Sequence, residues 1–231
     1  GSGISDAYQP PEADACLMAA CGRVIADHGL PTTILTKSNL VVRDLDVWTE
    51  VNAAAGFVLM MSLVTLDDGL RAIVEPGASP VEARLDALRA FKACGCGVGV
   101  AAMPLLPFLG DSDAQLDALA GRLAQEDVDF VLVGGLTLRP GRQKAAFFET
   151  LRRSFPDLVS CYEKLYGEGR TSGAPLREYG EDVHARAEAA FARAGLVTVL
   201  PHRLYHGRIP VYDEADVLLQ LRRPDTVGAD D

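Results

Sequence analysis

The segment Pro31-Thr32-Thr33-Ile34-Leu35-Thr36-Lys37-Ser38-Asn39 decides how this chain folds. It begins as an apolar run of strand-forming residues at 32–35 and stops on four polar residues that a core would exclude. Polar side chains at the carboxyl end of a buried strand are typical of the ligand sites of open α/β sheets and barrels. Lys37 is therefore the first candidate binding residue.

Similar strands recur along the chain, and a segment with helical spacing of apolar residues precedes each one. We predict strands at 32–35, 57–64, 98–103 and 129–136, preceded by helices at 12–28, 43–55, 80–93 and 112–126. Such alternation indicates βαβ crossovers and a parallel sheet. The predicted fold class is α/β, a parallel-stranded partial (open) TIM-type barrel of repeated βα units.

After Pro140 the pattern becomes mainly helical. We predict helices at 144–155, 159–166 and 179–194, a short extended piece at 204–214, and a last helix at 215–221. The expected organisation is an α/β part at 1–140 and a helical C-terminal extension at 141–231 that packs on the barrel.

Composition narrows the class of protein. The 231 residues have a formal net charge of -10, which argues against a surface that binds nucleic acid by neutralising phosphates. Neither a membrane-spanning apolar run nor a signal-peptide pattern is present, so a cytoplasmic protein is expected. An odd number of dispersed cysteines without a CxxC predicts free thiols that serve as small buried apolar groups; they are Cys16, Cys21, Cys94, Cys96 and Cys161.

The predicted strand ends carry groups suited to one ligand. Lys37 suits a carboxylate or a phosphate, and Ser62 and Thr65 suit ribose hydroxyls. Gly134 and Gly135 let the backbone approach a flat ring, since neither has a side chain. Because parallel strands end at one edge of a sheet, these groups are expected to converge there.

Five ordered segments resemble the spore-photoproduct-lyase-like branch of the radical SAM superfamily. The first is S-G-I-S-D-A-Y-Q-P-P-E at 2–12, and the second is I-L-T-K-S at 34–38 followed by V-R-D at 42–44. The others are S-L-V-T-L-D at 62–67, E-P-G-A-S-P at 75–80 with Arg84 and Leu85, and P-L-L-P at 104–107 before Asp111. The resemblance covers about the first 140 residues and is loose beyond them.

The resemblance implies S-adenosylmethionine and a 4Fe-4S cluster as cofactors. It implies that Lys37 contacts the methionyl carboxylate, Ser62 the ribose, and Ser5 and Asp6 the amino group. Further candidate cofactor-binding residues are Thr36, Ser38 and Gly134.

The family's cluster motif, CxxxCxxC, is absent from the sequence. In that family it lies upstream of the Y-Q-P segment, so the cluster ligands are expected in a segment that precedes this sequence. This chain alone is then expected to be inactive, and its edge strand to be open to self-association. The resemblance names neither a catalytic residue nor a substrate.

Other polar groups have simpler interpretations. Glu75 and Arg84 are expected to form a structural pair. The acids Asp213, Glu214 and Asp216 suit the positive end of a helix dipole.

No metal site is predicted. His202 and His206 are four residues apart, but Pro201 and Gly207 argue against a helix that would place both on one face. Cys161 beside Tyr162 is the one pair we consider for hydrogen-atom transfer, with Tyr166 and Tyr205 as further tyrosines.

The leading hypothesis is the S-adenosylmethionine-binding part of a radical SAM enzyme. An alternative is a cluster-less α/β module that binds a nucleotide or a protein partner in the same cleft. A third is an aldolase-type barrel in which Lys37 forms a Schiff base, although no acid or base accompanies it.

Overall fold

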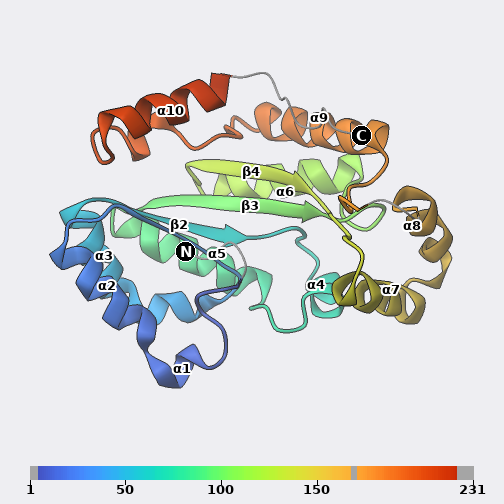
Figure 1. Cartoon of the computed structure of the whole chain (residues 1–231), viewed down its shortest axis with the longest axis horizontal. Helices are drawn as coiled ribbons and strands as arrows, with labels where there is room; N and C mark the ends of the chain where they lie inside the picture. The colour runs from blue at the N-terminus through green and yellow to red at the C-terminus, as the bar shows by residue number, and fades with distance from the viewer. Residues whose placement is uncertain (1–4, 168–170, 223–231) are drawn as a thin grey trace.

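The computed structural model describes residues 5–167 and 171–222, with side-chain environments up to residue 219. Four parallel strands form one sheet in the order β1-β2-β3-β4. They are β1 (Thr32–Thr36), β2 (Phe57–Ser62), β3 (Gly97–Leu105) and β4 (Phe130–Gly135). The sheet is open, with β1 and β4 at its edges (Figure 1). The predicted α/β class with an open parallel sheet is confirmed.

Helices precede and follow the strands as βα repetition requires. In the first part they are α1 (Glu12–Ala15), α2 (Leu17–Asp27), η1 (Asn39–Asp44), α3 (Leu45–Ala54), α4 (Asp68–Val74), α5 (Val81–Ala93) and α6 (Asp113–Gln125). After β4 they are α7 (Arg142–Ser154), η2 (Pro156–Leu158), α8 (Val159–Leu165), α9 (Arg177–Arg193), η3 (His202–Leu204) and α10 (Val211–Arg222).

Two predicted helices are each divided in the structure. The helix predicted at 12–28 breaks at Cys16, whose φ of 50° is left-handed and therefore ends α1 before α2 begins. The helix predicted at 43–55 starts earlier as the 3-10 helix η1, because the Ser38 side chain accepts a hydrogen bond from the Leu40 amide.

The segment at 204–214 is not extended, contrary to the prediction. His202–Leu204 forms the 3-10 helix η3, a turn follows, and α10 begins at Val211. The Glu214 amide donates to the Pro210 carbonyl at 2.9 Å, so the helix starts directly after the proline. A proline just before the first helical residue is compatible with this start, since its missing N–H has no helical partner.

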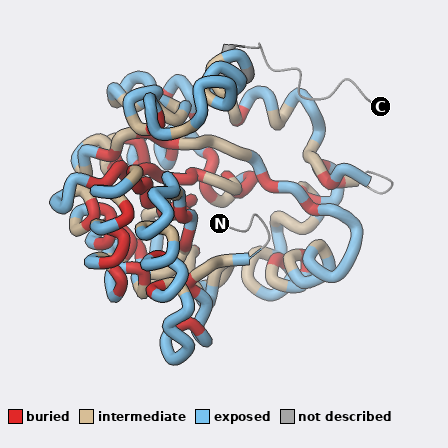
Figure 2. Tube along the Cα trace, turned by 60° about the vertical axis from the view of Figure 1, so that its left-hand side comes forward, coloured by how far each residue is buried: buried red, intermediate tan, exposed pale blue. Residues whose placement is uncertain are grey.

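The two faces of the sheet have different environments, because successive residues of a strand point to opposite sides. On the outer face, Ile34, Leu59 and Val100 are at most 2% exposed beneath the helices. Figure 2 shows the buried residues concentrated in the sheet and the helices packed on it. The inner face carries Leu35, which is 44% exposed, and Met60, which is half-buried. The inner face is therefore partly open over β1 and β2.

The inner face is covered toward the amino ends of the strands. The Phe130 ring lies so close to Gly99 that a Cβ there would approach it to 2.4 Å. Leu204 packs over Gly97 in the same way, with a methyl 3.1 Å from the position of a Cβ. A ligand on this face would consequently lie toward the carboxyl ends of the strands.

A second apolar cluster lies beyond the carboxyl ends. It joins the segments after β3 and β4 to α7 and α8 through Leu106, Leu136, Leu138, Phe148, Leu151, Tyr162, Leu165 and Tyr166. In Figure 1 these two helices lie past the arrowheads, while α10 lies toward the strand starts. Within the described residues, no helix combines the length and apolar character needed to span a bilayer.

Candidate functional site

The parallel register brings the candidate residues to one end of the sheet. Thr36 of β1 pairs with Met61 of β2, so the next residues, Lys37 and Ser62, are neighbours. Ser62 in turn pairs with Ala101 of β3. The register thus brings Lys37 and Ser62 together, while Gly135 pairs with Leu105, four residues beyond the partner of Ser62.

Asp6 fixes the start of the described chain to the end of β1. Its Oδ1 accepts from the Thr36 hydroxyl at 2.6 Å and from the Tyr8 amide at 2.8 Å, and its Oδ2 accepts from the Lys37 amide at 2.8 Å. The Ser38 amide donates to the Thr36 hydroxyl at 3.0 Å. These polar groups thus hold the backbone around Lys37 in place, while Ser5 is exposed beside them.

Lys37 presents a reachable cation at this end. Its side chain is 40% exposed, and its Nζ lies 3.6 Å from Oε1 of Glu75. Its carbonyl accepts from the Ser79 amide at 3.0 Å, which ties the strand end to the segment between α4 and α5. The backbone of Lys37 is therefore fixed, while its ammonium remains open to an anionic ligand.

Arg84 is the buried support of the same region. Its side chain is 1% exposed, and its guanidinium donates to the carbonyls of Ser62 at 2.6 Å and Ser79 at 2.8 Å. It also pairs with Glu75 at 3.1 Å, which confirms the predicted pair. The Glu75 carboxylate pairs with both cations and therefore holds the Lys37 ammonium near the buried Arg84 guanidinium.

Ser62 and Gly134 are less accessible than their sequence positions indicate. Ser62 is 3% exposed and its hydroxyl donates to the Met103 carbonyl at 3.2 Å, so its acceptor lone pairs are what it can offer a ligand. Gly134 is half-buried, and a Cβ there would lie 3.1 Å from Cβ of Met103. Gly135 is exposed, with open space where a Cβ would stand.

The cavity beside Gly135 is small. A cavity of about 30 Å³ next to Gly135 is bordered by Leu105, Asp111 and Tyr179. That volume suits water rather than a nucleotide. A larger ligand would therefore occupy the partly open inner face of the sheet.

A buried network not identified as such from the sequence joins two of the motif segments. The Tyr8 hydroxyl donates to Asp44 at 3.0 Å and accepts from the Trp48 indole at 2.6 Å. Arg43 pairs with Asp44 at 2.7 Å and with Glu12 at 2.8 Å. The Y-Q-P-x-E and R-D segments are thus partners in space, which their separation in sequence concealed.

The charges of this network are stabilised mutually. Burial raises the pKa of the Tyr8 phenol well above its ordinary value, so it remains a donor. Burial alone would raise the pKa of Asp44, but hydrogen bonds from Arg43 and Tyr8 outweigh it and lower that pKa. The carboxylate is therefore kept ionised beneath α1 and α3.

Tyrosines near the second apolar cluster are engaged as hydrogen-bond donors. Tyr162 donates to the Pro107 carbonyl at 2.6 Å, and Tyr166 donates to the Leu136 carbonyl at 2.9 Å. Their rings stack with centroids 5.9 Å apart. Burial raises the pKa of both phenols, which agrees with a structural role; hydrogen transfer through Cys161 and Tyr162 stays a prediction.

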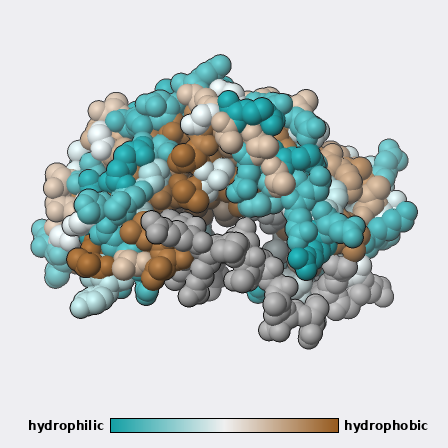
Figure 3. All heavy atoms as spheres, turned by 90° about the horizontal axis from the view of Figure 1, so that it is seen from above, coloured by the Kyte–Doolittle hydropathy of each residue, from teal (hydrophilic) through white to brown (hydrophobic). Residues whose placement is uncertain are grey.

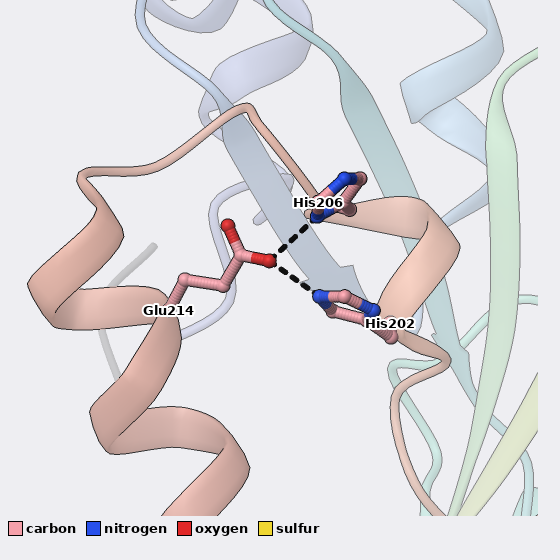
Figure 4. A group of neighbouring side chains, drawn as sticks. All are labelled: His202, His206 and Glu214. Carbon is pink, nitrogen blue, oxygen red and sulfur yellow. Dashed lines mark hydrogen bonds and ion pairs between the residues drawn. The ribbon is translucent and has the colours of Figure 1, made fainter.

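A second polar group gathers near the amino ends of the strands. Figure 4 shows His202, His206 and Glu214 directed toward one another, from η3, the following turn and α10. Oε1 of Glu214 lies 2.7 Å from Nδ1 of His206 and also meets Nε2 of His202. Hydrogen bonds from these two rings and the Gly207 amide lower the pKa of Glu214 to about 2.

The sequence did not predict this grouping. The 3-10 turn places the two imidazoles with ring centroids 4.7 Å apart, although Pro201 and Gly207 flank the segment. Asp213 and Glu214 lie in the first turn of α10, as the helix-dipole interpretation requires, but Asp216 lies beyond that turn. Glu214 additionally contacts both histidines, and an HxxxH spacing followed by an acid eight residues later was the one available signal.

The five cysteines are free, but the predicted role as small buried apolar groups is wrong for three of them. Cys16, Cys21 and Cys94 are exposed, whereas Cys96 is buried. Among the described residues, the group of three or more potential metal ligands is His202, His206 and Glu214, and it contains no cysteine. This chain's thiols therefore do not assemble a cluster site in the described structure.

Sequence comparison finds relatives that are longer than this chain. No protein-family model matches it. Uncharacterized proteins of Mycobacterium tuberculosis and Mycobacterium bovis are 34% identical over 207 residues, which cover 90% of this chain and 61% of theirs. An uncharacterized protein of Methanocaldococcus jannaschii is 31% identical over 110 residues, covering 48% of this chain and 41% of its own. The chain thus spans about 61% of the mycobacterial relatives.

Structural comparison finds the fold of spore photoproduct lyase. A variant of that enzyme with bound AdoMet and dinucleoside spore photoproduct superposes with a TM-score of 0.60 at 16% identity, covering 85% of this chain and 60% of the enzyme. The enzyme complexed with dinucleoside spore photoproduct gives 0.57 at 17% identity, with coverage of 80% and 57%. At such identity the likeness shows a shared fold alone.

Proposed function

We propose that the carboxyl ends of β1 and β2, with the open inner face beside them, bind S-adenosylmethionine as part of a radical SAM enzyme. The observation that supports this most is Lys37, an exposed cation with a fixed backbone that lies next to Ser62 at the open end of the sheet. The fold shared with a lyase that has been seen with AdoMet bound supports the choice of ligand.

The residues present fit the parts of that cofactor. The Lys37 ammonium offers both charge and hydrogen bonds to the methionyl carboxylate. Asp6 retains acceptor lone pairs for the amino group, and exposed Ser5 stands beside it. Ser62 offers lone pairs to the ribose, and the backbone at Gly134 and Gly135 offers a flat surface to the adenine. Thr36 and Ser38 position this edge rather than contact the cofactor.

A 4Fe-4S cluster would supply the electron that cleaves S-adenosylmethionine to a 5'-deoxyadenosyl radical. Its three thiolates are proposed to lie outside this sequence, because the chain has no CxxxCxxC and its described cysteines do not gather. This chain is proposed to bind the carboxylate, amino and ribose groups of S-adenosylmethionine. The substrate is not proposed.

The test separates recognition of the carboxylate from recognition of the nucleoside. We expect Lys37→Ala to weaken S-adenosylmethionine binding by about 10- to 100-fold, the worth of a hydrogen bond to a charged group. Binding of 5'-methylthioadenosine, which lacks the carboxylate, should be unchanged. Isothermal titration calorimetry measures both, and Lys164→Ala is the matched control, since Lys164 is exposed on α8. Equal S-adenosylmethionine affinity in Lys37→Ala would refute the assignment.

A cluster-less nucleotide-binding module is the alternative, and the dispersed cysteines favour it. In that case adenosine compounds without a methionyl group should bind as tightly as S-adenosylmethionine. The second discriminating measurement is made on a form of this chain that includes a CxxxCxxC segment. Reductive release of 5'-deoxyadenosine after anaerobic reconstitution with iron and sulfide is expected only if the protein is a radical SAM enzyme.

A further inference from the structure

The group formed by His202, His206 and Glu214 has the composition of a transition-metal site. Nε2 of His202, Nδ1 of His206 and Oε1 of Glu214 lie within 4.8 Å of one another. Two imidazole nitrogens and one carboxylate oxygen form the set that Zn²⁺ binds in open three-ligand sites. Hard cations such as Mg²⁺ prefer oxygen ligands alone, so imidazole argues for a metal of the zinc type.

Backbone hydrogen bonds hold the two histidines on one side of their turn. The His206 amide donates to the His202 carbonyl at 2.8 Å, which brings residues four apart onto the same face. The Gly207 amide donates to Oε2 of Glu214 at 3.3 Å. This contact occupies the second carboxylate oxygen and leaves Oε1 directed at the rings, as Figure 4 shows.

The histidine-bearing turn is itself fixed to the sheet. Leu204 packs against Gly97 at the start of β3, and Arg203 pairs with Asp129, just before β4, at 2.6 Å. Tyr205, which lies between the two histidines in the sequence, is 7% exposed. Two of the three prospective ligands therefore come from a preorganised segment, while the third comes from α10.

In its described part, helix α10 contacts the rest of the chain through a narrow, half-buried face formed by Glu214, Val217 and Leu218. None of its residues from 211 to 219 is buried, and Val211 and Tyr212 are 78% and 88% exposed. Figure 3, the view from above, shows hydrophilic residues over much of this face, with apolar ones in patches among them. Because helices in proteins owe most of their stability to a packed apolar face, a face this narrow makes the contact of Glu214 with the two histidines important for the position of α10.

We propose that His202, His206 and Glu214 bind one zinc-type divalent ion, with a water as fourth ligand, and that this ion fastens α10 to the amino end of the sheet. Ligand bonds of about 2.0–2.2 Å place tetrahedral donors about 3.3 Å apart. The Glu214–His206 contact of 2.7 Å must then widen by a fraction of an ångström. The His206 side chain is 69% exposed and the His202 side chain 44%, so both rings are free to move this far.

The first measurement is zinc binding by the chelator-stripped chain. We expect isothermal titration to show one Zn²⁺ bound per chain. Each of the variants His202→Gln, His206→Gln and Glu214→Gln should lose at least about tenfold in zinc affinity. Loss of a residue that supports a ligand already costs this much, and loss of the ligand itself should cost no less. The control is the double variant His28→Gln/His184→Gln, which changes the other two histidines of the sequence and should bind normally. Circular dichroism verifies that the variants fold.

Cobalt substitution identifies the ligands independently. Co²⁺ in this site should give weak visible bands without the intense near-ultraviolet absorption of thiolate ligands, and Glu214→Gln should remove them. Thiolate absorption, zinc affinity unchanged in all three variants, or no zinc bound at all would each overturn the proposal. S-adenosylmethionine binding through Lys37 is not involved, so this outcome is independent of the proposed function.

Discussion

The two ends of the sheet hold their polar residues by different means. At the carboxyl end, Arg84 is 1% exposed and joins three segments through carbonyls and Glu75. At the amino end, Arg203 is 60% exposed and reaches Asp129, whose side chain is 9% exposed and also accepts from Lys92 and the Val98 amide. Buried polar groups must be satisfied by fixed partners, whereas exposed ones exchange partners with water. The carboxyl end is therefore a rigid frame around Lys37, whereas at the amino end the exposed Arg203 contributes less to the stability of the fold.

The strongest test of this difference is Arg84→Met. We expect it to lower the free energy of unfolding by about 3–5 kcal/mol, because removing one partner of a buried ion pair leaves the others uncompensated. Urea unfolding followed by circular dichroism measures the loss. Arg177→Met is the matched control, since Arg177 is 79% exposed and pairs with Glu181 at the surface. A loss below about 1 kcal/mol for Arg84→Met would contradict the rigid frame.

A smaller effect is expected from Tyr8→Phe, which keeps the ring and removes the hydroxyl. The Trp48 indole then loses its acceptor and Asp44 loses a donor, both in a buried setting. The expected cost is about 1–3 kcal/mol of unfolding free energy, measured in the same way. Tyr212→Phe is the control, because Tyr212 is 88% exposed. Equal stability of the two variants would show that the Tyr8 hydroxyl is not needed.

The smallest effect is expected from Arg203→Met, the amino-end counterpart of Arg84→Met. Asp129 keeps its bonds from the Lys92 ammonium at 3.0 Å and the Val98 amide at 2.8 Å. The cost should stay within about 1 kcal/mol, as for exposed ion pairs. If Arg203→Met lowers the free energy of unfolding as much as Arg84→Met does, the two ends of the sheet do not differ in this way.

The sequence predicted the sheet better than the segments around it. The four strands and their parallel direction were identified because each is an apolar run between amphipathic helices, a pattern that depends on local residues. Local residues also start helix α6, where Ser112 is the N-cap and Gln115 completes a capping box. The short helix α4 was missed, although Asp67 caps it by accepting from Gly69 and Leu70.

The candidate site was predicted in composition rather than in detail. The neighbours Lys37 and Ser62 follow from strand ends in a parallel sheet. That Ser62 and Thr36 would be buried, and that Asp6 would bind the backbone of Lys37, depended on contacts across 30 or more residues. Periodicity does not report such contacts, because it describes one element at a time.

The sequence by itself determined the α/β alternation, the polar strand end at Lys37 and the absence of a CxxxCxxC. These are properties of single segments, set by spacing and residue type. Only the tertiary structure decided that Tyr8 meets Asp44 and that Glu214 meets His202 and His206. Such contacts depend on the paths of the loops between the helices and strands. These paths are determined by the packing of the whole chain rather than by local conformational preference.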